Sequence, residues 1–140
     1  MWHTDTREAL GSLLQIQFSS PESTREICIS EIFGRIDLFE KKYSRFCSGN
    51  TLESINSCIG SWQEIDPETR LLLSRLDALL GKRDLGFSLA VKKNLESLGY
   101  DRHYSFLPQS EVTRISPGGF TLRGGELLID APVEFGGFGK

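Results

Sequence analysis

The stretch LLQIQFSSPESTREICISEIFGRIDLFEKKY, residues 13–43, decides the fold class, because a strand pattern passes directly into a helix pattern. Leu14, Ile16 and Phe18 alternate with glutamines, which is the period of a half-buried strand. Ser20-Pro21-Glu22 is typical of a helix start, with a capping serine, a proline suited to the first turn and a glutamate that complements the helix dipole. The helix is expected to pack on a sheet and to end near residue 43. Its apolar stripe consists of Ile29, Ile32, Phe33, Ile36, Phe39 and Tyr43.

Three further helix patterns follow. Thr51 can cap a short helical turn that runs through Asn56, and Asp66-Pro67-Glu68 repeats the start signal for a long helix that ends at Gly81. A third pattern begins after Gly86-Phe87 and ends at Gly99, with Ser88 as its expected cap and Val91, Leu95 and Leu98 on one face. The buried side of the long helix is expected to comprise Leu72, Leu73, Leu76, Leu79 and Leu80.

After Tyr100 the pattern changes to short strands separated by glycine-rich turns. Residues 112–115 and 120–122 read as strands joined by Ser116-Pro117-Gly118-Gly119, and Arg123-Gly124-Gly125 turns the chain into residues 126–129. A strand, then helices, then a β-meander predicts an α+β fold in which helices pack on an antiparallel sheet.

The composition excludes several classes of function. The 140 residues fit one domain, and a hydrophobic content of 39% can fill a core. A net charge of −3 gives no general attraction to nucleic acid or anionic lipid, so neither nucleic acid nor a membrane is an expected partner. The sequence has no apolar run of the roughly 20 residues that a spanning helix needs, and no signal-peptide pattern. A cytoplasmic location is therefore expected.

The cysteines and histidines predict neither a metal centre nor a classical catalytic set. Cys28, Cys47 and Cys58 are widely spaced and odd in number, which argues against a disulfide framework and indicates a reducing compartment. His3 is expected in a frayed terminus and His103 in a loop, each without a nucleophile partner. No catalytic residue is assigned.

The C-terminal stretch EFGGFGK, residues 134–140, can present backbone N–H groups and an ammonium group to a phosphate. It is not a Walker A loop, because Glu134 stands where a glycine is needed and no Ser or Thr follows Lys140. Alone it is a weak signal. Because domains seldom end on a glycine-rich segment with two large aromatic residues, we expect the chain to be interrupted here.

Five short motifs occur along the chain in the order in which one protein family carries them. They are Ala9-Leu10-Gly11-Ser12; Tyr43-Ser44-Arg45-Phe46 followed by Thr51-Leu52-Glu53-Ser54-Ile55-Asn56; Gly86-Phe87-Ser88-Leu89-Ala90-Val91; Leu98-Gly99-Tyr100-Asp101; and Ile129-Asp130 with the stretch from Val133 to Lys140. Each motif is unspecific alone. Together, over the whole chain, they resemble the ApbE-type FAD:protein FMN transferases, whose motifs read AMGT, FS-x-Y followed by S-E-L-x-x-x-N, G-x-F-D-P-T-V, LGYD and D-L-G-G-x-x-K-G.

The resemblance implies a fold and an activity. Residues 1–140 would be the N-terminal part of a single ApbE-like (T-fold-like) domain, truncated at the GGFGK loop. Family members bind FAD with Mg²⁺, split its pyrophosphate, release AMP and esterify FMN to a Thr or Ser hydroxyl of an acceptor flavoprotein. The family's main metal-binding Asp and Thr lie in a C-terminal half that these 140 residues lack, so the chain alone is expected to be inactive.

The resemblance also implies site residues. The backbone carbonyl of Gly137 would be a metal contact. The flavin contacts would be Leu10, Phe46, Gly86, Phe87, Ser88, Glu134 and Lys140. Four of them depart from the family, since Leu10 replaces a methionine, Phe46 a tyrosine, and Ser88 and Glu134 an aspartate each. Weaker or altered flavin binding is therefore expected, and core packing explains Leu10 equally well.

Two other interpretations remain open from the sequence. The chain could be a non-catalytic module that binds a flavin nucleotide or a partner protein, or a soluble α+β domain whose motif order is a coincidence. A reading frame that continues past Lys140 with the missing Asp and Thr would favour the enzyme. A stop codon there, with no complementary half encoded nearby, would favour the binding module, whereas a complementary half would indicate a split transferase.

Overall fold

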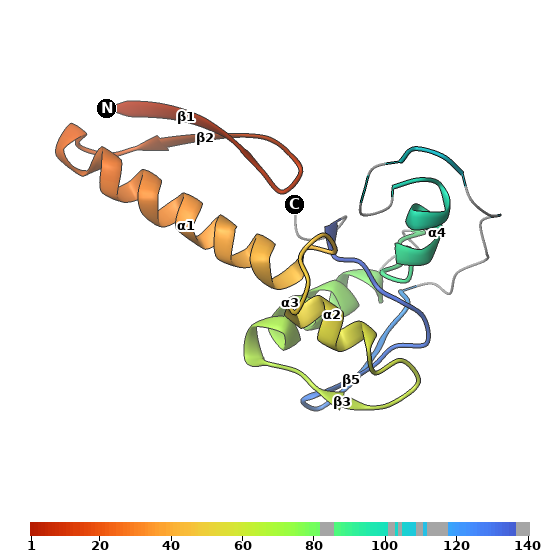
Figure 1. Ribbon diagram of the computed structural model, residues 1–140. Helices are drawn as coiled ribbons and strands as arrows, with labels where there is room; N and C mark the ends of the chain where they lie inside the picture. Colours follow the sequence, from red (N-terminus) through yellow and green to blue (C-terminus); the bar gives the residue numbers. More distant parts are fainter. Residues whose placement is uncertain (82–85, 101–102, 104, 109–110, 112–117, 137–140) are drawn as a thin grey trace.

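The computed structural model describes residues 1–81, 86–100, 103, 105–108, 111 and 118–136. These residues form two parts that meet at the end of the longest helix (Figure 1). We call residues 1–43 the arm and the described residues from 50 onward the body. The α+β class, with antiparallel sheets and helices, is confirmed. The strand expected over 112–115 lies outside the described residues.

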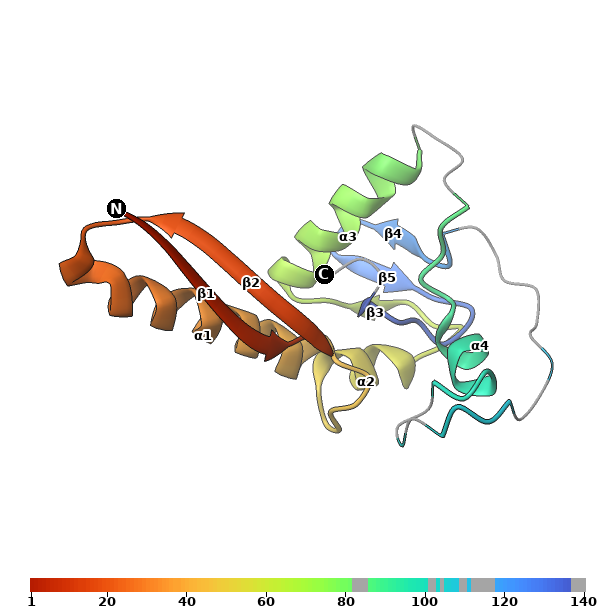
Figure 2. The same ribbon diagram turned by 90° about the horizontal axis from the view of Figure 1, so that it is seen from above.

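The arm is a β-hairpin laid along a helix. Strands β1 (Trp2–Ala9) and β2 (Ser12–Ser19) pair antiparallel, with His3 opposite Phe18 and Arg7 opposite Leu14. Both views show the hairpin running beside α1 (Arg25–Tyr43), with its turn near the C-terminal end of that helix (Figures 1 and 2). The half-buried face of β2 carries Leu14, Ile16 and Phe18, as the alternation predicts.

Strand β1 was missed by sequence reasoning because the face it turns toward α1 is polar. Arg25 of α1 donates to the Asp5 carboxylate at 3.3 Å, and Arg7 pairs with Asp37 of α1. The expectation that His3 lies in a frayed terminus is wrong. Its side chain is buried, and its Nε2 lies 3.0 Å from the Ser20 carbonyl oxygen.

The start of α1 also differs from the expectation. A 3₁₀ turn (Glu22–Thr24) precedes the helix, and no side chain caps either element. The Ser20 hydroxyl donates instead to the Pro21 carbonyl at 3.1 Å. The end at Tyr43 is as predicted.

The body contains three helices among the residues described: α2 (Thr51–Asn56), α3 (Pro67–Leu80) and α4 (Lys92–Ser97). Asn50, rather than Thr51, caps α2 through its side-chain oxygen, and Asp66 caps α3. Leu73 and Leu76 of α3 are buried, whereas Leu79 is 56% exposed, so the predicted apolar side is too wide. Leu98, expected on the buried face of the third helix, is exposed and lies just beyond α4.

A small antiparallel sheet completes the body, in the order β3 (Gln63–Glu64), β5 (Glu126–Leu128), β4 (Thr121–Arg123). The β4–β5 hairpin reverses at the predicted glycine turn. Strand β3 was not predicted, because its two residues form no recognisable pattern. The Arg123 guanidinium lies over the Trp62 ring, with its Cζ 4.1 Å from the ring centroid. Trp2, at the far end of the arm, is 77% exposed.

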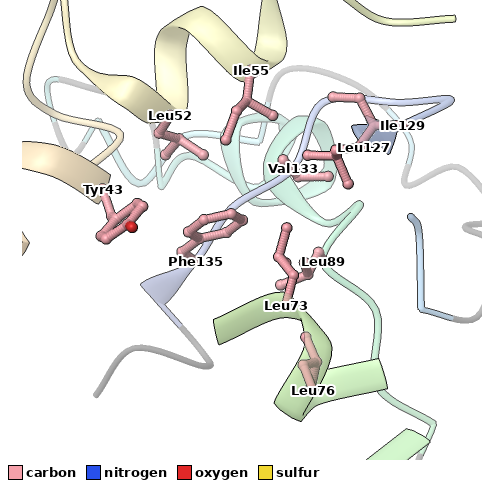
Figure 3. Close-up of a cluster of buried hydrophobic side chains, with 10 residues drawn as sticks. All are labelled: Tyr43, Leu52, Ile55, Leu73, Leu76, Leu89, Leu127, Ile129, Val133 and Phe135. Carbon is pink, nitrogen blue, oxygen red and sulfur yellow. The ribbon is translucent and has the colours of Figure 1, made fainter. Parts of the chain in front are cut away.

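The core of the body collects side chains from both helical and extended segments (Figure 3). Its buried members are Tyr43, Leu52, Ile55, Leu73, Leu76, Leu89, Leu127, Ile129, Val133 and Phe135. Nine of these belong to the body, and Tyr43 is the last residue of α1. Phe39, one turn earlier in α1, is partly buried and packs against the same cluster, so two aromatic side chains anchor the arm in the body's core. No helix among the described residues is long and apolar enough to cross a membrane.

An ionic network joins the end of α1 to the start of α3. The Lys42 ammonium donates to Asp66 at 2.7 Å and to Glu68, and the Thr69 hydroxyl donates to Asp66 at 2.6 Å. Partial burial works to raise the pKa of the Asp66 carboxyl, but the hydrogen bonds from Lys42 and Thr69 outweigh it and lower that pKa to about 2. Burial raises the pKa of the Tyr43 phenol, whose oxygen lies 2.8 Å from the Thr69 hydroxyl.

Two substitutions of Asp66 separate its two roles. Asp66→Asn keeps a capping oxygen but loses the charge and the acceptor of the Thr69 hydroxyl, so it is expected to lower the free energy of unfolding by about 1 kcal/mol, because the ion pair is partly exposed. Asp66→Ala also removes the cap and is expected to cost roughly 1–2 kcal/mol at pH 7. Urea unfolding measures both, and equal losses for the two variants would contradict the capping role.

The same variants have a defined pH dependence. Because the pKa of Asp66 is about 2 in the folded chain against 3.8 ordinarily, its charge favours the folded state above pH 3.8. That advantage is lost as the pH falls through the folded pKa. The deficit of Asp66→Asn relative to the unsubstituted chain should therefore shrink between about pH 4 and pH 2. An unchanged deficit at pH 2 would show that the charge of Asp66 does not cause the difference in stability.

Candidate functional site

A cavity of about 480 Å³ lies where the arm meets the body. It is built from four separate segments: the hairpin turn, the end of α1 with the loop after it, the residue following Gly99, and the segment before Gly137. Its lining consists of Leu10, Gly11, Phe39, Glu40, Tyr43, Ser44, Arg45, Phe46, Cys47, Tyr100, Glu134, Phe135 and Gly136. Its volume lies within the range of small-molecule sites, about 300–1,000 Å³.

The hairpin turn supplies one wall. Leu10 and Gly11 form the two-residue loop between β1 and β2, and both have left-handed backbone conformations, with φ of 54° and 69°. Such turns favour Asn-Gly, because a side chain like leucine is strained at positive φ. Leu10 is nonetheless held there, with its side chain at the cavity.

Aromatic rings supply the floor. The Tyr43 ring lies 4.7 Å from the Phe39 ring and 5.3 Å from the Phe135 ring, centroid to centroid. Figure 3 shows Tyr43 and Phe135 side by side at the edge of the core cluster. Both are almost fully buried, so the floor of the cavity is continuous with the core and is as rigid as that core.

Ser44, Arg45, Phe46 and Cys47 supply another wall, and the loop from Ser44 to Asn50 that carries them is fixed at both ends. The Asn50 side-chain amide donates to the Ser44 carbonyl at 2.7 Å, while its oxygen accepts from the Glu53 backbone at 3.0 Å. The Glu53 carboxylate in turn accepts from the Gly49 backbone N–H. Glu53 is the residue of the second motif whose side chain takes part in this reciprocal capping.

Arg45 is the unusual residue of this wall. Its guanidinium lies over the Phe46 ring, with Cζ 4.6 Å from the centroid. Its Nε and Nη1 atoms are buried and have no hydrogen-bond partner among the residues described. The cavity is also lined by the carboxyl-bearing residues Glu40 and Glu134, and the described chain shows no ion pair between Arg45 and either.

The segment before Gly137 supplies the last wall and is held by Asn56. The Asn56 side chain accepts from the Val133 N–H at 2.7 Å and donates to the Val133 carbonyl at 3.0 Å, across 77 positions of the sequence. Beyond it, the Glu134 carboxylate accepts from the Gly136 N–H at 2.7 Å. A Cβ at Gly136 would lie 2.3 Å from Glu134 Oε1, so the glycine makes this carboxylate position possible.

The structure brings together three of the predicted flavin contacts, Leu10, Phe46 and Glu134, from three distant parts of the chain. Gly86, Phe87 and Ser88 do not line this cavity. Lys140 and Gly137 lie outside the described residues. The ligand-binding role of every one of these residues stays a prediction.

The segment Gly86–Ser88 lies behind the Glu134 wall. Glu134 donates its backbone N–H to the Leu89 carbonyl at 2.8 Å, so the two segments are joined directly. The Ser88 hydroxyl accepts from the Ala90 N–H at 3.1 Å, and the N-cap of α4 is Val91, so the expectation that Ser88 caps the helix is wrong. Gly119 lies beside Ser88. It has a positive φ of 78° and no room for a Cβ.

Sequence reasoning missed Arg45, Tyr100 and Phe135 as lining residues. The latter two stand inside the fourth and fifth motifs, so their aromatic character at those places was the available signal. Arg45 gave none, because it occupies the variable position of the second motif and a single arginine after a helix is normally solvated. Only the burial of its nitrogen atoms distinguishes it.

The described residues do not fit a Mg²⁺ centre by themselves. Among residues 1–81, 86–100, 118–136 and the few others described, no three His, Cys, Asp or Glu side chains gather as metal ligands would. Mg²⁺ prefers six oxygen ligands, with one or two carboxylates.

Comparisons with solved structures identify the fold. The ApbE protein of Thermotoga maritima superposes with a TM-score of 0.82 over 99% of this chain, at 20% identity. The flavinyl transferase ApbE of Pseudomonas stutzeri gives 0.70 over 96%, at 18% identity. A variant of the flavin transferase ApbE from Vibrio cholerae gives 0.73 over 100%, at 15% identity. No protein-family model matches the sequence, and no curated protein matches it.

The chain spans about half the length of these structures: 48%, 49% and 52%. It has the fold of an N-terminal portion of ApbE flavin transferases, as the motif order predicts. The interpretation of that order as a coincidence is thereby set aside. At these identities the likeness concerns the fold.

Removing the Asn56 side chain should loosen the Glu134 wall. Asn56→Ala leaves the Val133 N–H and carbonyl unpaired in a buried segment and is expected to lower the free energy of unfolding by roughly 2–3 kcal/mol. Ser57→Ala, one position on, removes an exposed hydroxyl and is the control, with an expected change within about 0.5 kcal/mol. Urea unfolding measures both variants. Similar losses of stability would mean that the two hydrogen bonds between Asn56 and Val133 contribute little.

Leu10→Asn should stabilise the turn, because asparagine tolerates the left-handed conformation. The free energy of unfolding is expected to rise by about 1 kcal/mol. Leu13→Asn, at an exposed position of β2, serves as the control for the change in polarity. A loss of stability in Leu10→Asn would mean that packing of the leucine outweighs its backbone strain.

Proposed function

We propose that the cavity binds the flavin nucleotide of an FAD:protein FMN transferase, of which this chain forms one part. The whole protein would transfer FMN from FAD to a Thr or Ser of an acceptor flavoprotein, with Mg²⁺. The observation that carries the proposal is the cavity itself, where Leu10, Phe46 and Glu134 line one space.

The lining suits a flat aromatic ligand. Phe39, Tyr43, Phe46, Tyr100 and Phe135 supply five aromatic rings around one cavity. Rings of this kind stack on or pack against a planar heterocycle and contribute about 0.5–1.5 kcal/mol for each well-placed pair. Polar groups are few and placed at the walls, as in most small-molecule sites.

Each predicted contact has a distinct task in this proposal. Leu10 and Phe46 pack against the ligand from separate walls and exclude water from it. Glu134, held by the Gly136 N–H, accepts a hydrogen bond from the ligand. Gly86, Phe87 and Ser88 contact a part of the nucleotide beyond the cavity, through the segment joined to Glu134.

The remaining parts of the proposal concern groups outside the described residues. Lys140 places an ammonium near the phosphates, and the Gly137 carbonyl contacts the metal. A carboxylate and a hydroxyl from a C-terminal half complete the metal site, so residues 1–140 form the N-terminal part of one domain. A cytoplasmic location stays a prediction from the sequence.

The departures from the family predict weak flavin binding, and restoring a family residue should strengthen it. The chain is expected to bind FAD saturably but more weakly than the Pseudomonas stutzeri protein under the same conditions, because Phe46 lacks a phenolic hydroxyl and Ser88 lacks a carboxylate. Phe46→Tyr should raise the affinity by roughly three- to tenfold. Flavin fluorescence titration measures both, with Phe18→Tyr on the arm as the matched control. No saturable binding would overturn the proposal.

Transfer distinguishes the enzyme from a binding module. The 140-residue chain, given FAD, Mg²⁺ and an acceptor carrying a target threonine, is expected to attach no FMN, as followed by the mass of the acceptor. A chain continued through its own reading frame with the missing half should attach it. If that longer protein binds FAD and transfers nothing, the non-catalytic flavin-binding module is the function.

A further inference from the structure

We propose that Arg45 binds the phosphate group of the flavin nucleotide and so makes the cavity select phosphorylated flavins over riboflavin. This inference rests on the proposed function, because it assigns the part of the ligand that one wall recognises. Arg45 is not among the residues that the family resemblance assigns to the ligand. The inference comes from the burial and the missing partners of its guanidinium.

The geometry of the wall limits what Arg45 can do. Its guanidinium lies on the Phe46 ring, which fixes one face of the charged group. Two of its nitrogens, Nε and Nη1, are buried without a hydrogen-bond partner among the described residues. Nε–H and Nη1–H point from different edges of the guanidinium, so each can donate separately to an oxygen of an anionic ligand, and phosphate is an anion that arginine binds well.

The energetics favour a ligand over a structural role. An arginine stays charged at any pH that the protein tolerates, so the group cannot escape its burial by losing a proton. A buried donor without an acceptor costs about 1–3 kcal/mol, and more when it is charged. The stacking on Phe46 offsets only part of this, since such contacts are worth about 0.5–2 kcal/mol. An anion in the cavity removes the cost.

Neither carboxylate of the cavity provides that anion. The Glu134 carboxylate is turned to the Gly136 N–H, and Glu40 belongs to the last turns of α1. Neither forms an ion pair with Arg45 in the described chain. Nε and Nη1 of Arg45 therefore have no acceptor among the described residues and suit a ligand that is aromatic at one end and anionic at the other, which is the chemistry of a nucleotide.

The test compares FMN with riboflavin, which differ only by the phosphate. In fluorescence titrations of the 140-residue chain, FMN is expected to bind about tenfold more tightly, the size of one charge-assisted hydrogen-bond pair. Arg45→Met should lower the FMN affinity about tenfold and leave the riboflavin affinity within about twofold. Arg45→Lys should retain part of the preference, because a point charge replaces the planar guanidinium.

Two controls separate this role from a general effect. Lys41→Met removes the same charge from an exposed site on α1 and should leave the preference for FMN unchanged. Thermal unfolding of Arg45→Met without ligand should occur at or above the temperature of the unsubstituted chain, because the variant loses an unpaired buried charge. A structural arginine would produce the opposite shift.

The outcomes that overturn the inference are distinct. If FMN and riboflavin bind equally, or if Arg45→Met keeps the preference, Arg45 does not bind the phosphate and the flavin cavity still stands. If Arg45→Met melts lower and loses both flavins alike, the arginine is structural. If the unsubstituted chain binds neither flavin, the proposed function fails and this inference fails with it.

Discussion

The structure depends on the burial of the extended segment from Leu127 to Phe135 against α2 and α3, which precede it by more than 45 positions in the sequence. Leu127, Ile129, Val133 and Phe135 are nearly inaccessible, and the segment's backbone is paired with Asn56 and with the loop before β3. Apolar burial alone does not fix the position of an extended chain along its axis. The two directional bonds of Asn56 to Val133 do, and they thereby place the Glu134 wall of the cavity.

Much of the body could be predicted because local chemistry and packing agree there. Asp66-Pro67 and Gly81 bound α3 in both the sequence and the structure, and the glycine turn at 124–125 lies where the β4–β5 hairpin reverses. Strand β1 could not be predicted, because it turns His3, Asp5 and Arg7 toward α1 and satisfies them with partners up to 30 residues away. Alternation of apolar residues is no guide when ion pairs replace them.

The site was predictable to the extent that it coincides with family motifs. Leu10, Phe46 and Glu134 come from three motifs and do meet in one cavity. Of the aromatic floor, Phe39 and Tyr43 were predicted only as part of a helix stripe, because Tyr43 lies in the core and lines the cavity at once, and Phe135 was not predicted. Arg45 is distinguished by two buried nitrogen atoms without hydrogen-bond partners. Their burial depends on tertiary packing, which cannot be read directly from the sequence.

The positions of the two tryptophans have an optical consequence. Trp2 is largely exposed at the far end of the arm, whereas Trp62 is half-buried beneath Arg123 beside the small sheet, and neither is among the described residues that line the cavity. Unfolding changes the surroundings of Trp62 far more than those of Trp2, so tryptophan emission reports the body and is nearly silent about the arm. If the cavity binds flavin as proposed, flavin emission would originate at the junction of the two. Tryptophan and flavin emission would then report separately on the stability of the body and on the occupancy of the cavity.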